Sequence, residues 1–175
     1  LYENRKNVKA AIIVWDQQEK YLDRKHVIEA AWNWINMTIP VISSTFASFS
    51  RMCKNLGAET LGHLFIDEAG QALPQAAVGA IYRSRHVMVV GDPLQIKPVL
   101  TLDSNTLYML GEHFGVTEKY LSASASAQIL ADAASQYGFY RKQDKAEDSW
   151  VGIPLWVHRR CRYPMFTISN MISYD

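Results

Sequence analysis

The chain contains 175 residues, of which 49% are hydrophobic and 20% are charged, enough for a domain with a packed core. Its formal net charge of +1 does not point to nucleic acid as a strongly basic chain would, and it does not exclude nucleic acid either, because positive charge can be confined to one groove. Cys53 and Cys161 lie far apart without Cys-x-x-Cys spacing, which argues against a zinc site and against a disulfide scaffold. No apolar run approaches membrane-spanning length. We therefore expect no membrane partner and a reducing, cytoplasmic (intracellular) setting.

Residues 1–40 are expected to form a helical segment that precedes the main domain or is inserted in it. Between about residues 10 and 37, charged and apolar positions alternate with helical spacing. Pro40 ends this region. The spacing predicts core contacts at Trp15, Leu22, Val27, Ala30, Ala31 and Trp34.

Strand and helix patterns alternate from residue 41 to residue 99. Short apolar runs predict strands at residues 41–44, 64–66 and 87–90, and helical patterns predict helices near residues 47–56 and 74–81. This alternation is typical of a doubly wound α/β fold, in which helices flank a parallel sheet. Further helices are expected near residues 106–114 and 127–137, and the charged residues between 141 and 148 predict a mobile surface loop.

Acidic and amide side chains follow two of these predicted strands. Asp67 and Glu68 come directly after the apolar run that ends at residue 66, and the later strand leads into a turn that carries Asp92 and Gln95. Charged side chains are rarely buried without a partner, so these acids are expected at an open crevice. The carboxyl ends of parallel strands meet at one edge of a sheet, which predicts that the four side chains converge on one ligand.

A third apolar segment, residues 154–158, is followed by Arg159 and Arg160. Arginine supplies fixed positive charge, which suits an anionic ligand. Carboxylates for Mg²⁺, an amide for a water molecule and an arginine for a phosphate together make a set suited to nucleotide hydrolysis.

Residues 65–99, FIDEAGQALPQAAVGAIYRSRHVMVVGDPLQIKPV, resemble motifs II and III of superfamily 1 helicases. The Asp-Glu-Ala-Gly-Gln string is most similar to the branch that contains the nonsense-mediated-decay helicase. Residues 41–48 resemble the strand and loop upstream of motif II, and residues 155–170 resemble motif IV. The resemblance implies that residues 41–175 are the C-terminal part of the first RecA-like motor domain, of the P-loop NTPase type, with a variable region at about residues 101–150. It also implies an ATP-dependent helicase that couples Mg-ATP hydrolysis to movement on single-stranded DNA or RNA.

The resemblance assigns roles in ATP hydrolysis to four residues. Asp67 is expected to hold the Mg²⁺ ion through water, and Glu68 to act as the general base for the attacking water. Gln95 is expected to contact the γ-phosphate or its water. Arg160 is expected to reach the γ-phosphate across a domain interface, although relatives commonly have Gln-Tyr-Arg where this chain has His-Arg-Arg, so Arg159 is an alternative.

The resemblance also implies contacts with a single strand of nucleic acid. Ser44 and Thr45 correspond to a loop that contacts the sugar-phosphate backbone in the family, and Lys97 and Pro98 follow motif III where relatives approach the strand. Asp92 has two open interpretations, as a ligand-facing acid or as a residue that fixes its turn.

A helicase motor needs a Gly-x-x-x-x-Gly-Lys-Ser/Thr loop for the phosphates, and this chain contains none. Residues 57–62 have the glycine spacing, but His63 and Leu64 stand where lysine and Ser/Thr are required, so we predict an ordinary turn. We expect the chain to be a piece of a larger protein and to be inactive alone. Two other interpretations stay open: a noncatalytic scaffold or regulatory module that keeps a helicase-like fold, and a different magnesium-dependent phosphate enzyme.

Overall fold

The computed structural model describes residues 2–92, 96–100, 102–117, 120–121, 125–141, 149–153 and 163–173. The chain divides into two compact units, which are treated separately below: Leu1–Phe65 with Gln75–Met88, and Ile66–Pro74 with Val89–Asp175. The elements in chain order are α1 (Arg5–Asp16), the 3-10 helix η1 (Gln18–Tyr21), α2 (Lys25–Thr38), α3 (Phe46–Met52), β1 (Leu61–Ile66), the 3-10 helix η2 (Ala69–Gln71), α4 (Pro74–Tyr82), β2 (Ser84–Val89), α5 (Ser104–Phe114), α6 (Ala127–Ala134), β3 (Phe139–Arg141), β4 (Ser149–Val151) and α7 (Met165–Ser173).

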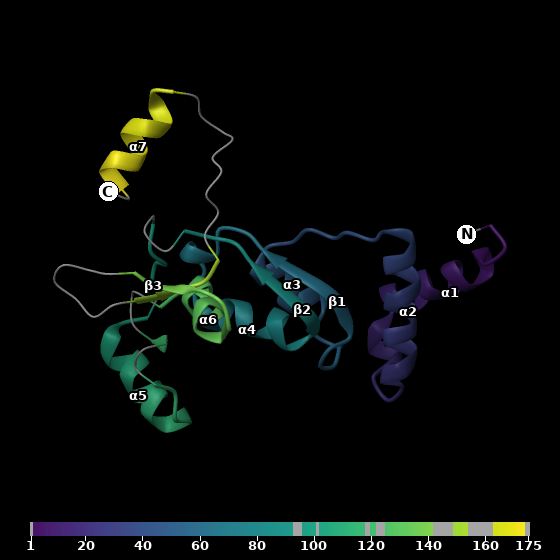
Figure 1. Cartoon of the computed structure of the whole chain (residues 1–175). Helices are drawn as coiled ribbons and strands as arrows, with labels where there is room; N and C mark the ends of the chain where they lie inside the picture. The colour runs from purple at the N-terminus through teal and green to yellow at the C-terminus, as the bar shows by residue number, and fades with distance from the viewer. Residues whose placement is uncertain are drawn as a thin grey trace. The chain divides into compact units, whose positions relative to one another are not determined.

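The helical region predicted between residues 10 and 37 is confirmed, but it forms two packed helices, α1 and α2, with η1 between them (Figure 1). The predicted buried face is wrong by one position. The buried residues of α2 are Ile28, Ala31, Trp32 and Ile35. Of the six residues that the spacing placed in the core, only Ala31 is buried. Trp32 is the reason, because this large side chain packs against Cys53 and Leu56 and thereby fixes the rotation of the helix.

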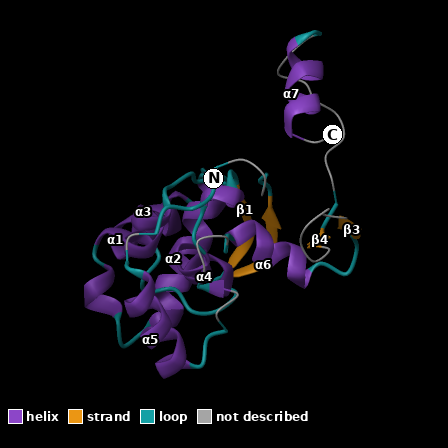
Figure 2. Cartoon of the chain, turned by 90° about the vertical axis from the view of Figure 1, so that its left-hand side faces the viewer, coloured by secondary structure: helices purple, strands orange, loops and turns teal. Residues whose placement is uncertain are grey.

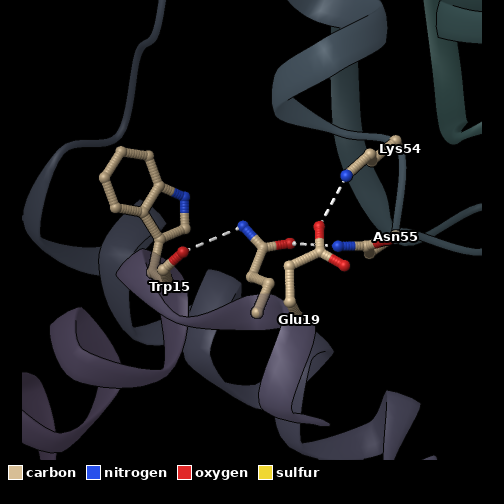
Figure 3. Close-up of polar contacts among 5 residues, drawn as sticks. Trp15, Glu19, Lys54 and Asn55 are labelled. Carbon is tan, nitrogen blue, oxygen red and sulfur yellow. Dashed lines mark hydrogen bonds and ion pairs between the residues drawn. The ribbon is translucent and has the colours of Figure 1, made fainter. Parts of the chain in front are cut away.

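The core of the first unit joins α2 to the segment between α3 and β1. Ile28, Trp32, Cys53 and Leu56 form its buried cluster, and partly buried apolar side chains, Leu61 of β1 among them, pack around it. Two polar contacts lie beside this cluster (Figure 3). Asn55 donates to Gln18 Oε1 at 3.2 Å, and Lys54 pairs with Glu19. The ion pair is exposed, so it orients η1 and contributes little stability.

Cys53 is a buried free thiol. Burial raises the pKa of this thiol to about 11, and the positive charge of nearby Arg83 partly offsets the rise. Because the thiolate is the reactive form, native Cys53 should react with a thiol reagent at pH 8 far more slowly than an exposed cysteine. The measurement is the rate of colour release from Ellman's reagent in a Cys161→Ser variant, with and without urea. A fast reaction without urea would contradict the burial.

The strand predicted at residues 41–44 is wrong, since this segment is irregular. Val41 is 82% exposed and Ile42 is 41% exposed, so the apolar run is not covered by the described part of the chain. A strand needs a hydrogen-bonded neighbour, and β1 pairs with β2 instead. The helix predicted next is confirmed as α3, which begins after the N-cap residue Thr45, although it ends at Met52 and not at residue 56.

The central βαβ arrangement is confirmed. Leu61 N donates to Arg83 O at 2.8 Å and Val90 N donates to Ile66 O at 2.8 Å, so β1 and β2 run in the same direction. Helix α4 is the crossover between them, as parallel strands require (Figure 2). The fold class is therefore mixed helix and strand, with a small parallel two-stranded sheet flanked by helices.

In the second unit, the predicted helices near residues 106–114 and 127–137 are confirmed as α5 and α6, although α6 ends at Ala134. An unpredicted antiparallel pair follows, in which β3 and β4 align Tyr140 with Trp150. Their rings meet edge to face with centroids 5.1 Å apart. The loop expected at residues 141–148 lies outside the described residues except for Arg141, which belongs to β3.

Asp103 caps α5 and makes its stability dependent on pH. Its carboxylate accepts hydrogen bonds from Thr106 N at 3.0 Å and Thr106 Oγ1 at 2.6 Å, and these donors lower its pKa below the usual value. The stabilisation is therefore present above the unfolded-state pKa of about 3.9 and is lost as the pH falls through the lower folded-state pKa. Asp103→Asn keeps a good cap but does not titrate, so it should lose less stability than the wild type in acid. Urea midpoints measured between neutral and acidic pH test this, and parallel curves would contradict it.

No helix in the described ranges is both long enough and apolar enough to cross a membrane.

Candidate functional site

The loops that follow β1 and β2 pack against each other through their backbones. Val90 N donates to Ile66 O at 2.8 Å, and Ala69 N donates back to Val90 O at 3.0 Å. These bonds extend the parallel pairing past the ends of both strands. The expectation that the two strand ends lie close together is therefore confirmed.

Glycine is required at this contact because the two backbones approach too closely for a side chain. A Cβ atom at Gly70 would clash with the carbonyl oxygen of Asp92. A Cβ atom at Gly91 would lie 2.6 Å from Gly70 N and 2.7 Å from Ala69 N. Both glycines appear in the motif strings, but their mutual contact cannot be read from the sequence.

Asp67 and Glu68 are both exposed at the end of β1. Asp67 Oδ1 accepts a hydrogen bond from Glu68 N at 3.0 Å. Glu68 has φ 53° and ψ 38°, the left-handed region that L residues other than asparagine and aspartate adopt uncommonly. Gln71 donates from Nε2 to Glu68 Oε2 at 3.3 Å, which holds the carboxylate from one side. Backbone strain of this kind gathers at functional sites, so it adds a geometric signal to the acid pair.

Helix α6 supports the acidic loop from a region whose sequence pattern is weak. Ala127 N donates to Ala72 O at 2.8 Å, which ties the start of α6 to the residue after η2. Ser126 caps α6 by accepting from Ile129 N at 3.3 Å. The small residues that precede α6 gave no sign of this role, although a serine before an apolar helical run is a typical N-cap signal.

The buried carboxylate of Asp132 connects α6 to Gly152, the residue that directly follows β4. It accepts a hydrogen bond from Gly152 N at 3.1 Å and another from Gln128 Nε2 at 3.0 Å. Asp132 is 7% exposed and accepts both hydrogen bonds from groups of the protein itself, so its role is structural.

No group of three or more histidine, cysteine, aspartate or glutamate side chains within the described segments is placed to hold a metal ion. Mg²⁺ in nucleotide enzymes is usually bound by one or two carboxylates together with phosphate oxygens and water. Asp67 and Glu68 supply such carboxylates, and their exposure leaves room for a hydrated ion. The two carboxylates are therefore of the kind that suits a hydrated magnesium ion.

Of the other residues expected near the phosphates, the structure describes only Asp92. Asp92 is described, and its backbone lies against Gly70 beside the acid pair. Gln95, Arg159 and Arg160 lie outside the described residues.

The residues expected to contact nucleic acid also differ in accessibility. Lys97 is exposed, whereas Pro98 is buried, so the proline ring packs inside the protein and is not available to a strand of nucleic acid. Ser44 and Thr45 are exposed in the first unit, and both hydroxyl groups make local bonds. Ser44 Oγ donates to Thr45 O at 2.9 Å, while Thr45 Oγ1 accepts from Ser48 N at 3.3 Å.

The glycine-spaced segment at residues 57–62 contains a turn within residues 57–60, and its last two residues already belong to β1, which agrees with the expected ordinary turn. Thr60 Oγ1 donates a hydrogen bond to Gly57 O at 3.1 Å, and this bond closes the turn.

Comparisons of the chain with protein-family models, with curated proteins and with solved structures gave no match.

Proposed function

We propose that this chain is part of the first RecA-like domain of an ATP-dependent superfamily 1 helicase. The observation that carries the proposal is the pair of backbone-packed loops at the carboxyl ends of β1 and β2, which bring Asp67, Glu68 and Asp92 to one edge of the parallel sheet. Ligands of open α/β sheets bind at this edge. The order of the residues along the chain agrees with motifs II and III of the family.

Glu68 is the proposed general base. Its carboxylate is exposed, so it can accept the proton of a water that attacks a γ-phosphate. The hydrogen bond from Gln71 restricts its orientation, and the left-handed backbone turns it away from the direction of the strand. Asp67 would hold a magnesium ion through water. The bound ion would neutralise part of the negative charge of the phosphates.

The other phosphate contacts are assigned by resemblance. Gln95 would sense the γ-phosphate, because an amide can both donate and accept hydrogen bonds. Arg160, or Arg159 in the alternative register, would approach the phosphate when a second motor domain closes. Single-stranded DNA or RNA would contact Lys97, Ser44 and Thr45 through its phosphates, and such contacts weaken as salt rises.

The experiment is to sequence the coding region on both sides of this segment, express the complete reading frame and measure ATP hydrolysis with and without single-stranded DNA or RNA. A Gly-x-x-x-x-Gly-Lys-Ser/Thr loop upstream together with strand-stimulated hydrolysis would support the proposal. A reading frame that lacks this loop and hydrolyses no ATP would overturn it in favour of a noncatalytic scaffold.

A further inference from the structure

The outward face of α1 carries two isoleucines that the rest of the first unit leaves half exposed. The inward face packs against α2 and includes the buried residue Ala11, whereas Ile12 is 52% exposed and Ile13 is 54% exposed. Isoleucine has a stiff, β-branched side chain and a lower helix propensity than alanine or leucine, so an exposed pair does not stabilise the helix by itself. The proposed nucleotide chemistry does not involve α1.

Charged residues of opposite sign flank this pair on the same face of the helix. Lys9 lies three residues before Ile12 and Asp16 lies three residues after Ile13, a spacing that places all four side chains on one side of α1. Both charged side chains are exposed, and neither makes an ion pair or a hydrogen bond with another residue in the described ranges. They cannot pair with each other, because seven residues of helix separate them by about 10.5 Å along the axis.

The order of the charges matches a second copy of α1 that runs in the opposite direction. In the chain, the midpoint between Lys9 and Asp16 is also the midpoint between Ile12 and Ile13. A two-fold axis through this point places Ile12 against the partner's Ile13, and Lys9 against the partner's Asp16. A parallel pair would instead oppose like charges, which is unfavourable. Because α1 is complementary to itself in charge, it favours a second copy of this chain over an unrelated partner.

The other helices in the described ranges do not share this arrangement. Helices α4 and α7 contain no charged residue, and α5 and α6 contain no lysine or arginine. Exposed apolar side chains on these helices therefore give no indication of what covers them, whereas those of α1 lie between two charges that specify a direction and a register.

We propose that the face formed by Lys9, Ile12, Ile13 and Asp16 is a self-association surface on which two copies of this chain form an antiparallel dimer. The isoleucines supply the apolar contact, and the two symmetry-related Lys9–Asp16 pairs fix its direction and register. Two helical turns make a small interface, so the dimer is weak and forms at chain concentrations of about 10–100 μM. The proposal does not depend on the chain being part of a helicase.

The first test is sedimentation equilibrium of the 175-residue chain at concentrations from about 5 to about 500 μM. The wild type should change from monomer to dimer over this range. Ile13→Ser and Lys9→Glu should each raise the dissociation constant at least about tenfold. Ile39→Ser is the matched control for the loss of an exposed isoleucine, because Ile39 is 53% exposed but lies at the end of α2, and this variant should dimerise like the wild type.

Charge exchange tests the pairing itself. Lys9→Glu makes both charged positions of the face acidic and Asp16→Lys makes both basic, so each variant alone should associate more weakly than the wild type. An equimolar mixture of the two variants should dimerise again, and so should the double variant Lys9→Glu/Asp16→Lys. Recovery of the dimer would also show that the variant chains fold, because a misfolded chain would not regain specific association.

The same measurement on the complete reading frame distinguishes a second copy from another segment of the same protein. A dimer in both the chain and the complete protein would support the proposed surface. A complete protein that stays monomeric, a wild-type chain that is still monomeric at about 500 μM, or a dimer of unchanged affinity in Ile13→Ser and Lys9→Glu would overturn it. None of these results bears on ATP hydrolysis, which is measured separately with magnesium.

Discussion

Replacing Glu68 by Gln should lower the rate of ATP hydrolysis by about 10²–10⁴-fold, the usual contribution of a general base. The amide has nearly the shape of the carboxylate and still fits the exposed position after β1, but it cannot take a proton from water. Nucleotide affinity should change little, because the phosphates bind through other groups. The measurements are steady-state hydrolysis by the complete protein and fluorescence titration with a labelled nucleotide.

Glu59→Gln is the matched control for this change. Glu59 is also exposed and also has a left-handed backbone, with φ 55°, but it lies in the turn before β1. Its carbonyl oxygen accepts from Arg85 Nε at 2.8 Å, a bond that the substitution leaves intact. Hydrolysis should therefore stay at the wild-type rate in Glu59→Gln. If Glu68→Gln and the wild type hydrolyse ATP at equal rates, Glu68 is not the general base, and the helicase proposal loses the role assigned to its acid pair.

The parts of the fold that the sequence predicted are those set by local pattern. The apolar runs before Asp67 and before Gly91 form β1 and β2, and the Pro74 start of α4 agrees with the preference of proline for the first turn of a helix. The position of the acid pair follows directly, because side chains that come after a parallel strand must lie at its carboxyl edge.

The parts that could not be predicted depend on partners distant in the sequence. The buried face of α2 is fixed by the contact of Trp32 with Cys53 and Leu56, and periodicity alone placed it one residue away. Val41 and Ile42 have the composition of a strand but no pairing partner in the structure as described. Tertiary context decided both cases.

In the candidate site, too, the residue types could be predicted from the sequence but their geometry could not. Residue types identified Asp67 and Glu68, but no pattern predicts that Glu68 adopts φ 53° or that Gln71 bonds to it. The support from Ala127 on α6 comes from a segment more than fifty residues later in the chain, and the bond from Ala127 N to Ala72 O joins them. Long-range contacts of this kind become visible only in the folded protein.

Gly91→Ala should destabilise the acidic loop by about 2–4 kcal/mol, which combines the cost of an overpacked contact with that of a lost backbone hydrogen bond. The new Cβ atom would stand 2.6 Å from Gly70 N and 2.7 Å from Ala69 N, and backbone atoms cannot rotate away as a side chain can. The loops would have to separate, which breaks the bond from Ala69 N to Val90 O. The local measurement is hydrogen exchange at the Ala69 amide, and the global one is the urea midpoint.

Gly62→Ala separates this steric effect from the general effect of replacing a glycine. Gly62 lies in β1, and a Cβ atom there would meet nothing within 4 Å, so the substitution should be neutral or stabilise the chain by up to about 1 kcal/mol through the unfolded state. Protection of the Ala69 amide should survive in Gly62→Ala and be lost in Gly91→Ala. Equal protection in the two variants would mean that the loops tolerate separation, and the close backbone contact would then not be what holds Asp67 and Glu68 at the edge of the sheet. Loss of protection in Gly91→Ala together with a fall in ATP hydrolysis would connect the contact between the loops to the chemistry proposed for the acid pair.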